Sequence, residues 1–422
     1  MLDLSASLVV ITALLAYVNQ RFVGLPPTIG VMSIALVLSC AFVGLDKLGI
    51  PALSNYERQL VGSIDFSRML IQGMLSFLLF AGALHVDLAK LRNHRWPIGI
   101  LAVLGTTVSA GLIGAGSWFL LRWFGVNLPF AYCLVFGTLI SPTDPIAVLA
   151  ILKTAGAPQN VAVIITGESL FNDGVGVVLF ALAFSLLSTP VAPDVSHIIL
   201  LFLQQAGGGI ALGLVLGFGT YSLLRSIDDY HVEVLLTIAV VMGGYTLAEG
   251  LHVSGLLAIV VAGLVIGNQG RARAMSEATR QRIDVFWELT DAILNAILFV
   301  LMGFEIILIK FPSAMIVPAI AILFLTLGAR LITVAFPIAL FRHSFGLPAG
   351  AWRILTWGGL RGGISVALAL SLPHGTERDA VVSLTYVIVL FSILVQGLTI
   401  GALVKRMLVG AVPTRIAPAD AR

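Results

Sequence analysis

The sequence predicts an all-α polytopic membrane protein, because its composition and its long apolar runs together exclude a water-soluble globule. Of the 422 residues, 59% are hydrophobic and 11% are charged, and the mean hydropathy is +1.04. About a quarter of the residues of a typical soluble domain are charged, whereas a disordered chain combines low hydrophobicity with high charge. A transmembrane helix needs about 20 apolar residues, and runs of that length fill nearly the whole chain.

Thirteen hydrophobic stretches predict about 13 transmembrane helices in a single domain over residues 1–422. Short loops rich in proline, glycine, asparagine and charge separate them, and only Gly250 and Leu251 separate the eighth stretch from the ninth. In chain order the stretches cover residues 4–22, 27–45, 65–85, 97–124, 130–152, 160–187, 197–224, 233–249, 252–268, 284–308, 313–340, 349–371 and 381–404.

The lysines and arginines predict that the N-terminus lies outside the cell and the C-terminus in the cytoplasm. Cytoplasmic loops of membrane proteins carry an excess of these residues. If the loop at 90–95 is cytoplasmic, alternation puts 16 of the 24 basic residues on that side and six on the other, with Arg330 and Arg361 inside stretches. Residues 405–422 then form a short cytoplasmic tail, and the basic segment 271–282 fits an ordinary cytoplasmic loop.

Two of the stretches are interrupted by residues that break helices. The fifth contains Ser-Pro-Thr-Asp-Pro at 141–145, and the twelfth contains Gly-Gly-Leu-Arg-Gly-Gly at 358–363. Interrupted helices at corresponding places in two halves point to the binding site of a transporter. An odd number of spans with termini on opposite sides fits two inverted six-helix repeats and one further helix, and the interruptions lie seven stretches apart, as this repeat requires.

Three acids, Asp144, Glu168 and Asp173, lie well inside the stretches. Asp144, Asp173 and Arg361 lie 12 to 14 residues into their stretches, which places them about 18–21 Å deep, near mid-bilayer. A charge there costs about 2.5–3.5 kcal/mol on insertion scales and almost always faces a cavity or a partner. A further arginine, Arg330, is expected to neutralise a helix C-terminus or a carboxylate. Three other acids fall near the ends of stretches, where we expect water to solvate them: Glu249, Asp291 and Glu305.

The prolines of the fifth stretch predict how its carboxylate is presented. Pro142 and Pro145 lack N–H donors and disfavour helix at the residue before each of them. We therefore expect the helix to unwind over 141–144 and to restart with Pro145 at its first position and Asp144 at its N-cap. The Asp144 carboxylate, the Thr143 hydroxyl and the freed carbonyl oxygens then suit a small hard cation. A proline-kinked helix in which Asp144 serves only as a cap is the structural alternative.

The sixth stretch carries two sets of polar residues. Ser169 and Asp173 are four residues apart and share one helix face, and Glu168 and Asn172 share the neighbouring face. We expect Ser169 and Asp173 to face an ion site, and Glu168 to face a cation that neutralises it. Arg361, alone at the same depth between two glycine pairs, is the predicted partner. Such a pair is structural, and removing either partner leaves the other charge buried and unpaired.

Three motifs occur in one order along the chain: SPTDPIAVLAILK at 141–153, GESLFNDGVGVVLF at 167–180 and GGLRGGISVALAL at 358–370. Together they resemble the bacterial NhaP-type sodium/proton antiporters of the monovalent cation:proton antiporter-1 family, to which the animal sodium/hydrogen exchangers also belong. The resemblance covers nearly the whole chain, from the second stretch to the thirteenth. It implies a homodimer and a mobile six-helix core in which the interrupted fifth and twelfth helices cross.

The resemblance also implies a division of labour along the chain. A dimerisation and scaffold part would comprise about residues 1–96 and 197–308, and an ion-transporting core about 97–190 and 313–404. The residues that match the family's site for Na⁺ and the proton are Thr143, Asp144, Ser169 and Asp173.

Other positions match the family's supporting residues. Asn172, with the aspartate after it, matches the Asn-Asp of the electroneutral branch, and Glu168 and Arg361 match the ion pair that holds the core together. One position departs from the pattern: several members carry an acid within a stretch like LLFEGAL, where this chain reads LLFAGAL with Ala81. An extra carboxylate near the site is then missing, which affects ion selectivity and affinity.

These features predict a secondary active antiporter that exchanges a monovalent cation, Na⁺ with Li⁺ accepted, for H⁺ by alternating access. Desolvation raises the pKa of a carboxylate and a bound cation lowers it, so the two ions compete for Asp173 and Asp144. One cation exchanged for one proton is electroneutral. We expect a multi-pass protein of the bacterial inner membrane that needs no cofactor. Its expected partners are the cation, the proton, the lipid bilayer and a second copy of the chain, and no nucleic acid.

Three other functions remain open from the residues alone. K⁺/H⁺ exchange would use the same groups. An ion-coupled metabolite symporter would need a larger site with aromatic or hydrogen-bonding side chains for an organic substrate. An intramembrane aspartyl protease would need two aspartates on successive spans, but prolines flank Asp144 and the sequence has no GxGD motif, so we predict that the chain is not an enzyme.

Overall fold

The described residues of the computed structural model are 2–48, 73–188, 195–270, 274–309, 312–348 and 350–409. Every regular element within these ranges is a helix, which confirms the predicted all-α class. Most are α-helices, and several continue into a short π-helical turn at one end.

The helices of the first half reach to residue 188. They are α1 (Leu2–Val18), η1 (Asn19–Val23), α2 (Pro27–Lys47), α5 (Leu75–Leu84), α6 (Leu88–Asn93), α7 (Arg95–Gly99), η3 (Ile100–Gly105), α8 (Thr106–Trp123), α9 (Phe130–Ile140), α10 (Ile146–Ala155) and α11 (Gln159–Ser188).

The helices of the second half begin at residue 195. They are α12 (Val195–Phe202), η4 (Leu203–Gly207), α13 (Gly208–Leu224), α14 (Tyr230–Gly250), α15 (Gly255–Val265), η5 (Ile266–Gly270), α17 (Glu277–Phe304), η6 (Glu305–Leu308), η7 (Ser313–Met315), α18 (Ile316–Phe345), α19 (Ala351–Trp357), α20 (Gly363–Leu370), α21 (Thr376–Phe391), η8 (Ser392–Gly397) and α22 (Leu398–Val409).

Each predicted stretch overlaps a helix or an interrupted pair of helices. Nine helices among the described residues are long and apolar enough to cross a membrane, and three further apolar helices are shorter: α5, α9, and α15 with η5. The third stretch begins at residue 65, which lies outside the described residues, as do Arg271, Arg273 and the tail beyond residue 409. The total of thirteen spans stays a prediction.

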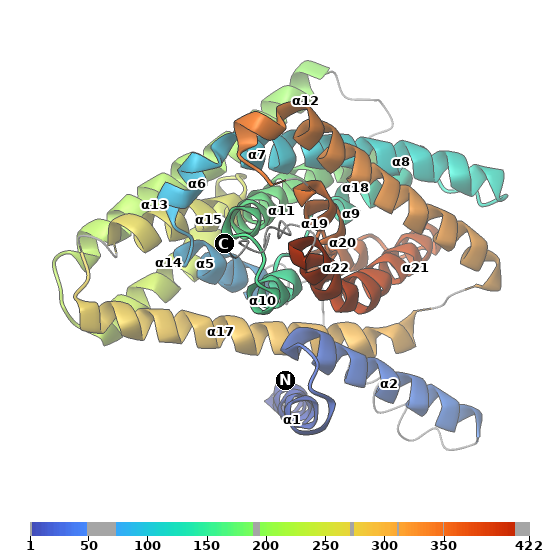
Figure 1. The fold of residues 1–422 in the computed structure, drawn as a ribbon, viewed down its shortest axis with the longest axis horizontal. Coiled ribbons are helices and arrows are strands. Elements are labelled where there is room, and N and C mark those ends of the chain that lie inside the picture. The colour runs from blue at the N-terminus through green and yellow to red at the C-terminus, as the bar shows by residue number, and fades with distance from the viewer. Residues whose placement is uncertain are drawn as a thin grey trace, which may run out of the picture.

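One group of helices packs around α15. In Figure 1, α5, α13, α14 and α15 lie together on the left, and α17 passes below them. Gly209, Gly213 and Gly217 repeat every four residues on α13, and a Cβ at each would lie within 2.8 Å of an α15 atom or of Ser254 just before it. Small residues at this spacing let two membrane helices approach closely. Trp287 of α17 fills the centre of the group and donates a 3.0 Å hydrogen bond to Thr237.

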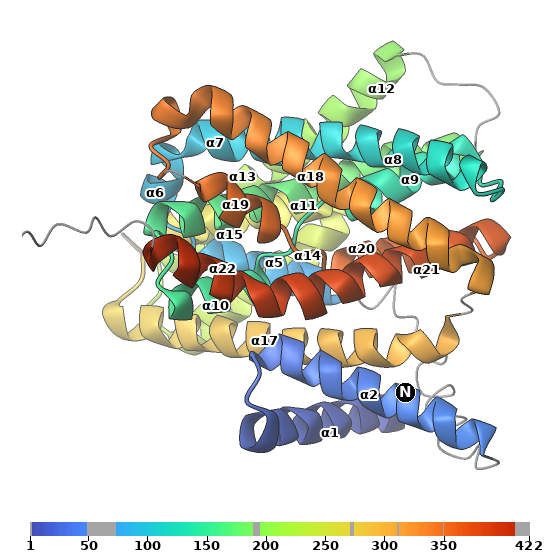
Figure 2. The same cartoon turned by 45° about the vertical axis from the view of Figure 1, so that its right-hand side comes forward.

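A second group contains α8, α9, α11 and α18 together with α19 to α22 (Figures 1 and 2). A Cβ at Gly137 of α9 would overlap the backbone carbonyl oxygen of Ala110 on α8, so these two helices also pack backbone to backbone. Helices α1 and α2 pack on the outer side of α17 (Figure 2), and α2 also contacts η8 of the second group. The predicted scaffold contains the helices of the first group and the predicted core contains those of the second, but the division into a fixed and a moving part stays a prediction.

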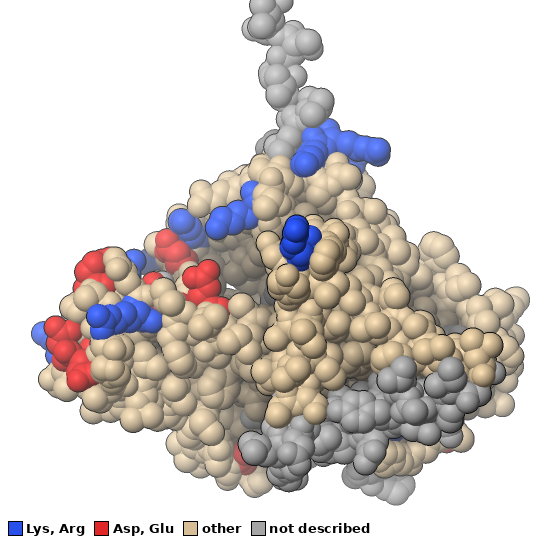
Figure 3. Space-filling view, turned by 90° about the horizontal axis from the view of Figure 1, so that it is seen from below, with Lys and Arg blue, Asp and Glu red and all other residues tan. Residues whose placement is uncertain are grey.

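On the face in Figure 3, most lysine, arginine and acidic side chains lie in the upper and left-hand parts of the view, and the tan area to their right carries few of them. Short polar side chains cap the beginnings of several helices. Asp229 caps α14 by accepting a 2.9 Å hydrogen bond from the backbone N–H of His231, and this bond holds the pKa of the exposed carboxyl below its usual value.

Candidate ion-binding site

Both predicted interruptions are present, and they touch each other. Helix α9 ends at Ile140 and α10 begins at Ile146, and α19 ends at Trp357 and α20 begins at Gly363. The backbone N–H of Asp144 donates a 2.8 Å hydrogen bond to the carbonyl oxygen of Leu360, so the two unwound segments meet directly. The membrane offers no water to exposed backbone groups, and this bond satisfies one group of each segment internally.

The restart of the helix differs slightly from the prediction. The N-cap of α10 is Pro145 rather than Asp144, and no side-chain hydrogen bond caps it. The carbonyl oxygen of Pro145 accepts the first helical bond, from the N–H of Leu149 at 2.8 Å. Asp144 therefore stands two residues before the first residue of α10, and its carboxylate lies beside Gly362, the N-cap of α20. A Cβ at Gly362 would overlap this carboxylate, so only glycine leaves it this position.

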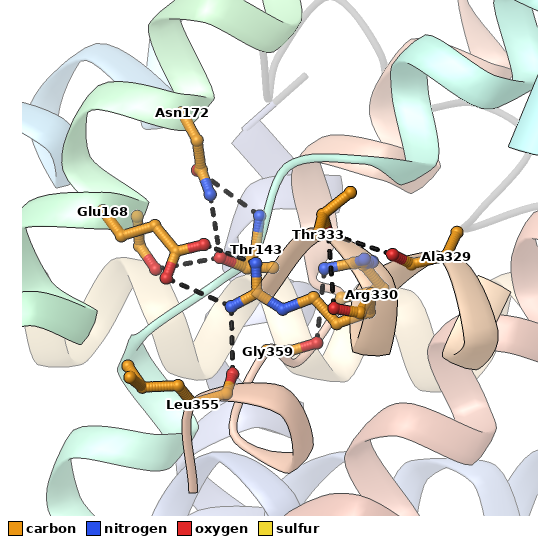
Figure 4. Close-up of polar contacts among 10 residues, drawn as sticks. Thr143, Glu168, Asn172, Ala329, Arg330, Thr333, Leu355 and Gly359 are labelled. Carbon is orange, nitrogen blue, oxygen red and sulfur yellow. Dashed lines mark hydrogen bonds and ion pairs between the residues drawn. The ribbon is translucent and has the colours of Figure 1, made fainter. Parts of the chain in front are cut away.

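A cluster of hydroxyl and amide groups joins the unwound segment to α11. The Thr143 hydroxyl lies 3.1 Å from the Ser169 hydroxyl. Asn172 donates a 2.8 Å hydrogen bond from Nδ2 to the Thr143 hydroxyl, and its Oδ1 accepts one of 3.4 Å from the Thr143 N–H (Figure 4). All three side chains are buried. The predicted residues Thr143 and Ser169 are thus brought together, and Asn172 fixes the orientation of Thr143.

The two predicted carboxylates line one cavity of about 510 Å³. Asp173 on α11 is 5% exposed, and Asp144 is partly buried. The remaining wall is mainly apolar, and it includes Ala81 of α5. An acid at position 81 would therefore face the same cavity as Asp144 and Asp173, which supports the aligned position of the missing carboxylate.

The buried ion pair of Glu168 differs from the prediction. Its partner is Arg330 of α18, which pairs with Oε1 through Nη1 and donates a 3.1 Å hydrogen bond from Nη2 to Oε2. Arg330 Nη2 also donates a 3.0 Å bond to the carbonyl oxygen of Leu355 on α19. The prediction that Arg361 forms this pair is wrong, because Arg330 reaches across from a neighbouring helix with both nitrogens of its planar fork (Figure 4). Glycine at 359 gives it room, since a Cβ there would lie 2.5 Å from Arg330 Nε.

Arg361 instead holds the second unwound segment in place. Its side chain is buried and donates a 3.3 Å hydrogen bond from Nη1 to the carbonyl oxygen of Gly359. Its backbone N–H donates a 2.8 Å bond to the hydroxyl of Ser392, which in turn donates a 2.8 Å bond to Gln396. Gln396 closes the network with a 3.3 Å bond to the carbonyl oxygen of Trp357. The backbone groups freed by the interruption are thus bound by side chains of η8.

Two of the acids that we expected at solvated helix ends, Glu305 and Asp291, have other surroundings in the structure. Glu305 is buried, with 5% of its surface exposed, and Asp291 lines the cavity with Asp144 and Asp173. Sequence reasoning missed Asp291 because it lies close to the expected end of a stretch. The spacing of Glu288, Asp291 and the later Leu298 on one helix face could have indicated a polar face toward a cavity.

Comparison with known proteins gives one family over nearly the whole chain. Residues 9–406 match the family model described as sodium/hydrogen exchanger, transmembrane. The chain is 53% identical over 414 residues to the Na⁺/H⁺ antiporter NhaP of Pseudomonas aeruginosa, covering 97% of this chain and 98% of that protein. It is 38% identical over 381 residues to the Na⁺/H⁺ antiporter NhaH of Halobacillus dabanensis, covering 89% and 91% of the two chains.

The fold also matches a solved structure. The sodium proton antiporter MjNhaP1 of Methanocaldococcus jannaschii superposes with a TM-score of 0.68 at 20% sequence identity, and the match covers 90% of this chain and 98% of that one. At this identity the likeness concerns the fold alone.

Proposed function

Because the chain belongs to the sodium/hydrogen exchanger family, we propose that it is a multi-pass secondary antiporter, and not an enzyme, that exchanges Na⁺ for H⁺ across the membrane. The observation that carries this function is the cavity in which Asp144 and Asp173 stand together beside the crossing of two interrupted helices. Carboxylate oxygens with the neighbouring hydroxyls of Thr143 and Ser169 are ligands that suit a hard cation. Li⁺ fits the same ligands.

The exchange follows from competition for these oxygens. Removal from water favours the protonated form of a carboxyl group, and a bound cation favours its ionised form. The pair therefore holds a proton where protons are abundant and Na⁺ where sodium is abundant. When the loaded site is exposed to one side of the membrane at a time, the two gradients are coupled. One Na⁺ exchanged for one H⁺ moves no net charge, so we propose electroneutral exchange.

Alternating access would come from movement of a core against a scaffold. The proposed core comprises about 97–190 and 313–404, and the proposed scaffold and dimerisation part comprises about 1–96 and 197–308. The interrupted helices, the Glu168–Arg330 pair and the Arg361 network all lie within the core, so it would move as one body. The cavity lies between this core and α5 and α17 of the scaffold. This placement supports a site that opens and closes at their boundary.

The side on which the cavity opens follows from charge. His85 lines the cavity at the end of α5, just before the basic residues Lys90, Arg92 and Arg95. If this loop is cytoplasmic, as the excess of basic residues on its side favours, the cavity opens toward the cytoplasm. We propose a homodimer in the bacterial inner membrane with its C-terminus in the cytoplasm.

Two other cargoes remain as outcomes of the test. K⁺ would use the same oxygen ligands in a slightly wider site. An organic substrate would need aromatic or varied hydrogen-bonding side chains on the cavity wall, whereas this lining is mainly apolar and its charged side chains are carboxylates. A bare monovalent cation fits this arrangement better.

The experiment uses proteoliposomes with an imposed pH gradient and a pH-sensitive dye inside. Na⁺, Li⁺ and K⁺ are added in turn to wild type and to Asp173→Asn, with and without a potassium and valinomycin clamp. We expect Na⁺ and Li⁺ to dissipate the gradient in wild type only, and the clamp to leave the rate unchanged. Full activity of a folded Asp173→Asn protein would refute the proposed site. Activity with K⁺ alone would change the cargo, and a response to the clamp would refute electroneutrality.

A further inference from the structure

One wall of the cavity is a polar face of α17. Glu288, Asp291 and Leu298 of this helix all line the cavity that Asp144 and Asp173 also line. At its inner end the wall touches the second interrupted helix, because a Cβ at Gly363 would lie 2.7 Å from the Leu298 side chain. Asp291 lies two helical turns before this contact, at about 10 Å along the axis. It therefore faces the cavity on the way to the central carboxylates.

The same face of α17 carries a buried amide with unused hydrogen-bonding capacity. Asn295 follows Asp291 by four residues, so the two side chains share a face. Asn295 is 2% exposed. Its side-chain amide is hydrogen-bonded to the Asp291 carboxylate, which can only accept, so Nδ2 is the donor and Oδ1 is left without a partner among the described residues. Buried polar atoms nearly always have a partner, and each exception calls for an explanation such as an ion. The Oδ1 atom of Asn295 and the carboxylate of Asp291 are both oxygen ligands for a hard cation.

The charge of the cavity lining favours cations throughout. Among the described residues, four carboxylates line it, from Asp144, Asp173, Glu288 and Asp291, and no lysine or arginine does. His85 is the titratable base among the lining residues, and its Nε2 lies 4.0 Å from Asp284 Oδ1. A cleft lined by one sign of charge raises the local concentration of the opposite ion.

We propose that Asp291 and Asn295 form a second, loading site for the transported monovalent cation, on the scaffold wall of the cavity that the central carboxylates also line. The cation binds first between the Asp291 carboxylate and the Asn295 Oδ1, and then passes across the cavity to Asp173 and Asp144. Because α17 belongs to the proposed scaffold, the loading site stays in place while the core moves. In this way α17 supplies a scaffold carboxylate to a cavity in which α5 carries Ala81 at the position where several related proteins carry an acid. This assignment rests on the proposed exchange of Na⁺ for H⁺.

The test measures Na⁺ dependence in proteoliposomes for wild type, Asp291→Asn and the matched control Glu288→Gln. Both variants remove one negative charge from the same face of α17, but Glu288 is exposed at the rim. We expect Asp291→Asn to raise the half-saturating Na⁺ concentration about tenfold, the change for a loss of about 1.4 kcal/mol in binding, with the maximal rate within about twofold. Glu288→Gln should change it less than about threefold, as a screened surface charge would.

Equal shifts in both variants would overturn the loading site in favour of a general electrostatic attraction, and no shift in Asp291→Asn would overturn it outright. Asn295→Leu tests the site with the acid in place, and we expect a shift in the same direction. If Asp291→Asn does not fold, the two single variants Asp291→Glu and Asn295→Leu decide. Near-normal Na⁺ affinity in Asp291→Glu together with weakened Na⁺ affinity in Asn295→Leu supports the site, and any other pair of results refutes it.

A binding measurement separates this site from the central one. In the transport-inactive Asp173→Asn protein, Na⁺ should still raise the thermal unfolding temperature through the loading site, and the further change Asp291→Asn should abolish that stabilisation. Persistence of the stabilisation in the double variant would refute the loading site. Full transport by Asp173→Asn alone would instead refute the proposed function, so the two failures are distinguishable.

Discussion

The Glu168–Arg330 pair allows a quantitative test of how the interrupted helices are held together. Arg330 joins α18 to Glu168 on α11 through both guanidinium nitrogens and to the carbonyl oxygen of Leu355 on α19. Glu168 is 1% exposed, so a lone charge there would be desolvated. Two hydrogen bonds between charged groups at about 1.5–3 kcal/mol each give about 3–6 kcal/mol. This agrees with the cost of about 3–5 kcal/mol for breaking a buried pair by removing one partner.

We therefore predict that Glu168→Gln and Arg330→Gln each lower the free energy of unfolding by about 3–5 kcal/mol. The double variant should cost less than the sum of the two, with a coupling energy of about 2–3 kcal/mol, near the upper end for contacting residues. The assay is a double-mutant cycle of unfolding in mixed micelles, and the control cycle pairs Glu168→Gln with Arg361→Gln. A larger coupling to Arg361 than to Arg330 would refute the assigned pair and restore the partner that the sequence predicted.

Further substitutions test the packing and the caps. We expect Gly362→Ala to leave the protein folded but raise the half-saturating Na⁺ concentration in transport assays, because its Cβ would displace the Asp144 carboxylate. Gly176→Ala should lower the free energy of unfolding by about 1–3 kcal/mol, since its Cβ would overlap a proline ring of the first unwound segment. The control Gly219→Ala meets nothing within 4 Å and should be neutral or stabilising in the same unfolding assay. Hydrogen bonding in the folded state lowers the pKa of Asp229. The stabilisation by this ionised cap is therefore present above the ordinary pKa of about 3.9 and is lost as pH falls below that value. We expect Asp229→Ala to lower the thermal unfolding temperature near pH 7 and to match wild type at low pH.

The local features of the site could be predicted from the sequence because each depends on neighbouring residues. Prolines at 142 and 145 fix the interruption of the fifth stretch through missing N–H donors and steric restriction of the preceding residues. The spacing of Ser169 and Asp173 fixes their shared helix face. These rules act over one or two turns. The structure has the expected interruption, and Asp173 lines the cavity, whereas Ser169 is bound to Thr143 and is not among the residues that line the cavity. The first residue of α10 differed by one position, which is the usual uncertainty of a helix end.

The features that sequence reasoning missed depend on contacts between distant helices. Glu168 has two candidate arginines at similar depth, and nothing in the local sequence tells which helix packs beside α11. Arg330 lies 14 residues into α18, about 21 Å along the axis, so its depth alone made it as good a partner as Arg361. Asp291 was misplaced for a related reason: distance from a span end says how deep a residue lies, but not whether a cavity reaches it.

Helix α11 carries polar residues that bind other protein groups and one, Asp173, that lines the cavity. Glu168 is bound by Arg330, and Asn172 is bound to Thr143, so these groups are satisfied inside the protein and hold neighbouring elements together. Backbone groups of the unwound segments are bound as well. The N–H of Asp144 donates to the carbonyl oxygen of Leu360, and the N–H of Arg361 donates to the Ser392 hydroxyl. Asp173, one residue beyond Asn172, instead faces the cavity. A buried carboxylate that does not hold the fold together needs a proton or a cation as its counterpart, and this requirement is what couples the two ions at one site.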